Sequence, residues 1–97
     1  MLLLVNVEIR WLVWDRRIIY KLKKKHNIEP EEVEEALFHS DPHIRSFRGV
    51  YHAYGRTGAG RYLFIVFVPL GKKRARIITA RDMTLEERRL FRRIKGG

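Results

Sequence analysis

The chain has 97 residues, of which 45% are hydrophobic and 33% charged. This composition predicts a folded chain, because a disordered chain is less hydrophobic. The length predicts a single domain that spans residues 1–97, because a second core would leave each half too small. A net charge of +10 predicts a basic surface for an acidic polymer, with RNA the first candidate. The absence of cysteine excludes disulfide scaffolds, thiolate-bound zinc and cysteine nucleophiles.

The chain begins with the apolar segment MLLLVNV, which lacks the basic region of a signal peptide. No stretch approaches the ~20 apolar residues of a membrane span, so we expect a cytoplasmic protein without a membrane partner. Residues 8–14 are rich in aromatic and β-branched types and predict a strand, with a backward extension through 2–5 as an option.

Two helices are predicted next, one basic and one acidic. Asp15 is the expected N-cap of a helix over 16–25, and Asn27 is suited to a left-handed stop after it. A second helix is predicted to begin at Pro30, with Glu31 in its first turn, where the helix dipole favours anions. Residues 28–41 carry six acidic and no basic residues, so this helix should form a separate acidic surface.

The rest of the chain changes from helical to strand periodicity. Residues 44–48, 51–57, 61–68 and 74–81 predict four strands joined by short turns, and Thr84 caps a last helix. The predicted class is therefore α+β, with the order β-α-α-β-β-β-β-α and helices packed on a mainly antiparallel sheet.

The strand at 51–57 places three chemically useful side chains on one face by alternation. These are His52, Tyr54 and Arg56, an imidazole, a phenol and a guanidinium that could move a proton, stack on a base and bind phosphate. The alternative is an exposed strand face of assorted polar residues.

The strand at 74–81 contains three arginines that alternation does not place together. Arg74 and Arg76 share one face and Arg81 falls on the other. They could contact one substrate only if the strand twists, bulges or ends before Arg81. On the simpler interpretation, the aliphatic part of the Arg76 side chain only covers the surface of the sheet.

The remaining histidines point to no metal site. His39 and His43 are four residues apart, but Pro42 would break a helix that brought them together, and no carboxylate cluster completes the set. His26 could be a half-buried side chain or a general acid or base. No cofactor motif is present, which leaves RNA cleavage as suitable chemistry, because RNA supplies its own 2′-hydroxyl nucleophile.

Taken in order, the motifs resemble those of the BrnT family of type II toxin–antitoxin systems. The resemblance covers nearly the whole chain from Trp14. It rests on WD at 14–15, KH at 25–26 followed by PEEVEEALF at 30–38, DP at 41–42, YGRT at 54–57 with GR at 60–61, RIITAR at 76–81 and ERRLF at 87–91. It departs from the family pattern at Asn27, Thr79 and Phe91, where Gly, Ser and Tyr are usual.

The resemblance implies a RelE-like fold and a metal-independent endoribonuclease of the mRNA interferase type, which stops growth by cutting RNA and is neutralised by a cognate, BrnA-like antitoxin, with a heterotetramer as one form of the complex. It also implies roles for residues. Arg81 and Arg56 would be cations at the phosphate, and His26 would transfer protons. Substrate contacts are expected from Arg76, Tyr54, Lys25, His52 and Glu31, with Glu31 alternatively closing its helix.

A second interpretation of the sequence is a basic module that binds nucleic acid without cleaving it, such as a degenerate toxin. Composition does not separate the two, since a basic face provides affinity in either case and only positioned acid and base groups provide turnover.

Overall fold

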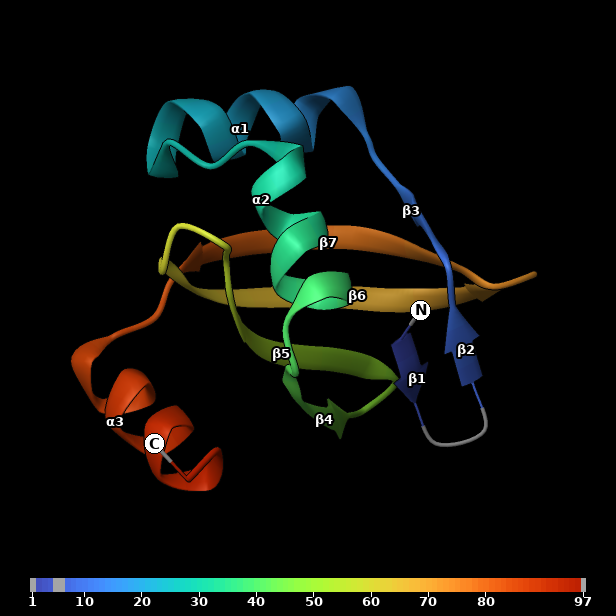
Figure 1. The fold of residues 1–97 in the computed structure, drawn as a ribbon. Coiled ribbons are helices and arrows are strands. Elements are labelled where there is room, and N and C mark those ends of the chain that lie inside the picture. The colour runs from blue at the N-terminus through green and yellow to red at the C-terminus, as the bar shows by residue number, and fades with distance from the viewer. Residues whose placement is uncertain (1, 5–6, 97) are drawn as a thin grey trace.

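The computed structural model describes residues 2–4 and 7–96 (Figure 1). The secondary structure consists of strands β1 to β7, helices α1 to α3 and a short π-helix, η1. Their bounds are β1 Leu2–Leu4, β2 Val7–Ile9, β3 Trp11–Val13, α1 Arg16–His26, α2 Pro30–Glu34, η1 Glu35–His39, β4 His43–Phe47, β5 Val50–Arg56, β6 Tyr62–Gly71, β7 Arg74–Asp82 and α3 Leu85–Ile94. No helix within the described residues is long and apolar enough to cross a membrane.

The main sheet has five strands in the order β3-β7-β6-β5-β4. β4 to β7 form an antiparallel meander, and β3 pairs with β7 in parallel because α1 and α2 carry the chain across one face before β4 begins. The α+β class and the mainly antiparallel sheet are therefore confirmed.

The N-terminal strand differs from the prediction, which placed one strand over residues 8–14. It is divided into β2, which forms a separate hairpin with β1, and β3, which joins the main sheet. The backbone N–H groups of Arg10 and Trp11 both donate to the carbonyl of Lys73, at 2.8 and 3.0 Å. Two successive N–H donors on one carbonyl break the alternation of a regular strand. The pairing of β2 with β1 ends at this point, and the pairing of β3 with β7 begins. Position 5, part of the predicted extension, lies outside the described residues.

The first two helices begin and end as their caps predict. The Asp15 carboxylate accepts from the Arg17 N–H at 2.8 Å, and Asn27 adopts a left-handed conformation with φ 53° after α1. Pro30 occupies the first turn of α2. The helix then continues as η1, whose end is closed by Ser40, because its hydroxyl donates to the carbonyl of Ala36 at 2.6 Å.

The central strand β6 contributes to two cores. Leu63, Ile65 and Phe67 are fully buried on the face that α1, α2 and η1 cover, together with Leu22 and Val33. The alternate residues point to the opposite face, where Phe64 packs with Met83 and Phe91 of the C-terminal segment. Figure 1 shows α3 set apart from the other helices, at one end of the sheet. Most of that second face is left without a helix, and we call it the open face.

Gly55 of β5 lies directly against the backbone of η1. A Cβ added there would collide with the carbonyl oxygen of Ala36, which is backbone and has little freedom to move. We expect Gly55→Ala to lower the free energy of unfolding by about 1–3 kcal/mol through overpacking. Urea denaturation should be compared with Gly58→Ala, whose Cβ would meet only the flexible Glu35 carboxylate at 3.3 Å. Equal stability of the two variants would contradict the close packing of η1 on β5.

Candidate functional site

A β-bulge in β7 brings all its arginines to the open face. The register with β6 shifts between Val66 and Phe67, so Ile78 is an extra residue relative to the partner strand. Ala75, Ile77 and Ala80 are all buried in the core despite their mixed spacing. Arg74 and Arg76 before the bulge, and Arg81 after it, therefore point to the same side. Of the options that the sequence left open, a bulge is the one that occurs.

Arg81 lies over the ring of Phe64, which is also contacted by two polar side chains of β5. The Arg81 guanidinium carbon is 4.3 Å from the Phe64 ring centroid. The His52 and Tyr54 rings lie 5.2 and 5.1 Å from the same centroid, the imidazole edge-on. The sheet register aligns Tyr54, Phe64 and Arg81 across three strands. We call these four residues the Phe64 cluster.

Glu87 holds Arg81 in place from the first turn of α3. Its carboxylate oxygens accept from the two Nη atoms of Arg81 at 2.7 and 3.1 Å, and Oε1 also accepts from the Thr84 N–H at 2.8 Å. The hydrogen bond from Arg81 is the main cause that lowers the pKa of the Glu87 carboxyl, against a smaller rise from burial. In the sequence, Glu87 is the first residue of the ERRLF motif and stands three residues after the cap Thr84, and the capping box between the two is present in the structure.

A second group of cations surrounds the ring of Tyr62, two residues from Phe64 on the same face of β6. The guanidinium carbons of Arg56, Arg88 and Arg92 lie 5.0, 4.8 and 5.3 Å from its centroid. Arg92 Nε donates to the phenol oxygen at 3.2 Å, and this hydrogen bond is the main cause that lowers the pKa of Tyr62. Within the described part of the chain none of the three arginines pairs with a carboxylate. We call this the Tyr62 cluster, and its uncompensated charge suits a phosphate.

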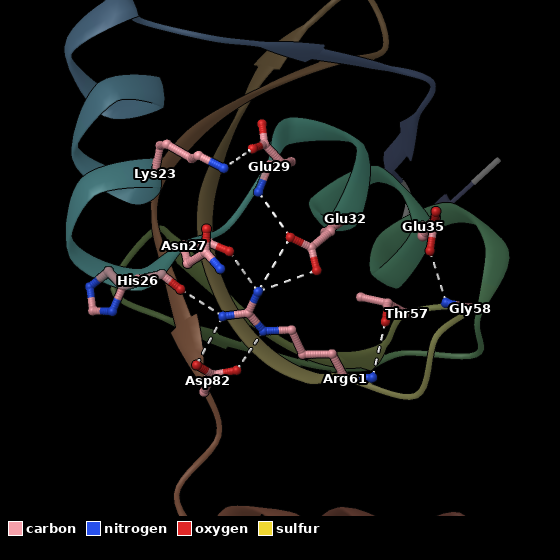
Figure 2. A network of polar contacts seen from close by, with 10 residues as sticks. All are labelled: Lys23, His26, Asn27, Glu29, Glu32, Glu35, Thr57, Gly58, Arg61 and Asp82. Atoms are coloured by element: carbon pink, nitrogen blue, oxygen red, sulfur yellow. Dashed lines mark hydrogen bonds and ion pairs between the residues drawn. The ribbon is translucent and has the colours of Figure 1, made fainter.

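Arg61 organises a polar network on the other face of the sheet (Figure 2). Its guanidinium donates to Asp82 at 2.7 and 3.0 Å, to Glu32 at 3.3 Å, and to the carbonyls of His26 and Asn27 at 2.6 and 2.8 Å. The network ties the α1–α2 connection to the end of β7. Because Asp82 follows Arg81 directly, Arg61 fixes the strand end that presents Arg81 to the open face.

The structure brings some of the predicted site residues together and leaves others apart. Arg81, Tyr54 and His52 meet at Phe64, and Arg56 lies beside them in the Tyr62 cluster. Arg76 shares the open face but lies before the bulge.

His26, Lys25 and Glu31 belong to α1 and α2, which cover the opposite face. His26 faces the Arg61 network through its carbonyl group, and Lys25 and Glu31 are exposed. The sheet therefore lies between the helices that carry these three residues and the open face on which Arg81 lies.

Sequence reasoning did not single out Phe64 and Tyr62, or Glu87, Arg88 and Arg92 of α3. Strict alternation along β6 would have placed the two aromatic rings on one face, opposite Leu63 and Ile65. The wholly apolar appearance of β6 concealed this, since an aromatic ring in a core and one that supports cations look alike in sequence.

Comparison with known proteins agrees with this architecture. A family model described as "Ribonuclease toxin, BrnT, of type II toxin-antitoxin system" matches residues 14–87. The crystal structure of the Brucella abortus ribonuclease toxin BrnT, at 17% sequence identity, superposes with a TM-score of 0.61 over 81% of this chain and 99% of that one. A search of curated proteins finds no match.

The structural match extends to nearly the whole of the Brucella protein, and at this identity it establishes the fold. The family model covers most of the chain, including β5, β6 and β7 with the bulge and the Phe64 cluster. The chain thus belongs to the BrnT family, the ribonuclease toxins of type II toxin–antitoxin systems.

Proposed function

We propose that this toxin is a metal-independent endoribonuclease of the mRNA interferase type, which cleaves RNA through attack of the 2′-hydroxyl on the adjacent phosphate. The observation that carries the proposal is the meeting of His52, Tyr54 and Arg81 around Phe64. This group combines a guanidinium, an imidazole and a phenol, all half-buried, on the open face of the sheet.

In the proposed reaction, neutral His52 accepts the proton of the 2′-hydroxyl as its oxygen bonds to phosphorus. Arg81 stabilises the negative charge that develops on the phosphoryl oxygens. The bond to the 5′-oxygen then breaks, giving a 2′,3′-cyclic phosphate and a 5′-hydroxyl that takes up a proton. Tyr54 contacts the substrate and donates a proton to the leaving oxygen, since its ring and the Arg81 guanidinium both pack on Phe64.

The Tyr62 cluster would bind a neighbouring phosphate of the same strand. Its three guanidinium groups, none of which pairs with a carboxylate of the described residues, lie on the same face as the Phe64 cluster, displaced by two residues of β6. Arg76, which lies before the bulge in β7, would contact the RNA backbone on that side of the cluster. The ring of Phe91 packs edge-on against Tyr62 at 6.0 Å, so this position supports the cluster without contributing a hydroxyl.

The decisive experiment is incubation of the purified protein with single-stranded RNA in EDTA. We expect cleavage to persist and the products to end in 2′,3′-cyclic phosphate. Salt-dependent binding without cleavage would overturn the enzymatic proposal and favour the non-catalytic binding module. Cleavage that EDTA abolishes would overturn metal independence.

The identity of the proton acceptor can be tested by two matched histidine substitutions. We expect His52→Gln to lower the cleavage rate by about 100-fold or more, the usual contribution of a general base. His26→Gln should change the rate much less, because His26 lies on the opposite face of β7 from Arg81. The reverse result would support His26 as the group that transfers protons, the role that the resemblance implies for it.

Membership of a type II family implies an antitoxin protein as partner and RNA as target. We propose a BrnA-like antitoxin, a complex of two toxins with two antitoxins, and action in the cytoplasm, where the RNA target is found. Light scattering of the co-expressed complex gives its mass directly, and a mass equal to one copy of each chain would contradict the heterotetramer.

A further inference from the structure

A small cavity lies between α3 and the edge of the sheet formed by β4 and β5. Its volume is about 210 Å³, below the ~300–1,000 Å³ typical of sites for drug-sized ligands, so it suits a single planar group. Leu90, Phe91 and Ile94 of α3 form an apolar wall, and Tyr54 contributes an aromatic ring. The wall is open to a ligand, since Leu90 and Ile94 are each 44% exposed. We call this cavity the α3 pocket.

The α3 pocket also has a polar rim, formed by His43, Arg45 and Glu87. Burial is the main cause that lowers the pKa of His43, with contributions from Lys95 and Arg45, so its imidazole is neutral at pH 7. A neutral imidazole offers one donor and one acceptor, Arg45 offers donors and Glu87 offers acceptors. An apolar wall with a rim of donors and acceptors matches an RNA base, which has apolar faces and polar edges.

The α3 pocket shares Tyr54 with the Phe64 cluster, and a second pocket residue, Glu87, is hydrogen-bonded to Arg81 of that cluster. Tyr54 packs against Phe64 at 5.1 Å, and Glu87 accepts from both Nη atoms of Arg81. A group bound in the pocket therefore lies next to whatever Arg81 contacts. On a polynucleotide, the group next to a bound phosphate is a base attached to the adjoining sugar.

We propose that the α3 pocket binds one nucleobase of the RNA, adjacent to the phosphate held by Arg81, and thereby selects which bond is cleaved. The inference deepens the proposed function, because it depends on RNA binding to the open face. An apolar side chain of the antitoxin is the competing occupant. The imidazole and guanidinium of the rim favour the base, because an apolar side chain would offer them no hydrogen-bond partner.

The test uses 2′-fluoro trinucleotides, which lack the attacking hydroxyl and stay intact. Methyl NMR should show the Leu90 and Ile94 signals shifting together on titration. Leu85, which is 59% exposed on the same helix and does not line the pocket, should not shift. Replacing one base at a time by hydrogen should identify a single position whose removal weakens binding about tenfold and abolishes both shifts.

The matched variants are Leu90→Gln and Leu85→Gln, two neutral changes at exposed leucines of α3. In Leu90→Gln, we expect removal of that base to weaken binding by less than about threefold, because stacking of the base on the apolar wall is lost. The affinity for the abasic trinucleotide should stay unchanged, because the phosphate contacts remain. Leu85→Gln should behave like the unmodified protein.

Three results would overturn the proposal: equal affinity for all abasic trinucleotides, unshifted Leu90 and Ile94 methyl groups, or a Leu90→Gln variant that loses only antitoxin binding. The last would assign the pocket to the antitoxin. Because the trinucleotides are not cleaved, these binding measurements do not depend on whether the protein cleaves RNA in EDTA. If the pocket binds no base, cleavage of RNA should still be observed.

Discussion

Arg81→Ala is expected to abolish growth arrest on expression and to lower the rate of RNA cleavage by about 100- to 1,000-fold, the usual effect of removing a group that stabilises developing negative charge. Arg81 is the cation that lies over the Phe64 ring, with its guanidinium carbon 4.3 Å from the ring centroid. It is held by two hydrogen bonds to Glu87, so a phosphate meets a guanidinium that is already oriented. The rate is measured on purified protein with a defined RNA.

The matched control for Arg81 is Arg74→Ala, an exposed arginine on the same face of the same strand. It should weaken RNA binding slightly at low salt without changing the maximal rate, because it lies far from the Phe64 cluster on the other side of the bulge. Circular dichroism should show both variants folded, since Glu87 keeps its hydrogen bond to the Thr84 N–H. A toxic Arg81→Ala protein would refute the assignment.

Arg61→Ala is expected to have the largest effect on stability, lowering the free energy of unfolding by about 2–3 kcal/mol and the melting temperature by about 10 °C or more. Its guanidinium is 25% exposed and makes hydrogen bonds to two carboxylates and two carbonyls from three parts of the chain (Figure 2). Removing it leaves Glu32 and Asp82 without their cation. Urea denaturation measures the loss.

Arg17→Ala is the matched control, because Arg17 also pairs with an aspartate, at 3.0 Å, but is 91% exposed. An exposed pair contributes about 0–1 kcal/mol, so this variant should be close to the unmodified protein. Similar losses in the two arginine variants would contradict the structural role given to the Arg61 network.

The effect of Arg61→Ala should also depend on pH. The hydrogen bond from Arg61 is the main cause that lowers the pKa of Asp82 below its ordinary 3.8, against a smaller rise from burial. A carboxyl whose pKa is lower in the folded state stabilises the fold above its unfolded pKa, and this stabilisation is lost as the pH falls through the folded value. The difference in the free energy of unfolding between the unmodified protein and Arg61→Ala should therefore be largest at neutral pH and shrink below pH 3.8.

Much of the fold could be predicted from local patterns. Asp15, Asn27, Pro30 and the capping box at Thr84 mark the helix boundaries, because each satisfies backbone groups within a few residues of itself. The prediction was wrong at the N-terminal strand, where the break between β2 and β3 depends on a distant carbonyl, that of Lys73.

The candidate site could likewise be predicted where it depends on one strand, and could not where it depends on contacts between elements. Alternation along β5 correctly grouped His52, Tyr54 and Arg56, because neighbours on one strand need no tertiary information. The partners from other elements, Phe64, Tyr62 and the arginines of α3, could not be foreseen, since their proximity depends on strand register and on where α3 packs.

The sequence by itself determined the basic charge, the order of the elements from α1 onward, the caps and the membership of Arg74, Arg76 and Arg81 in one strand. Only the tertiary structure decided that these arginines share a face. One extra residue in β7 reverses the alternation, and a bulge is visible only when the partner strand β6 is in place to show the shifted register.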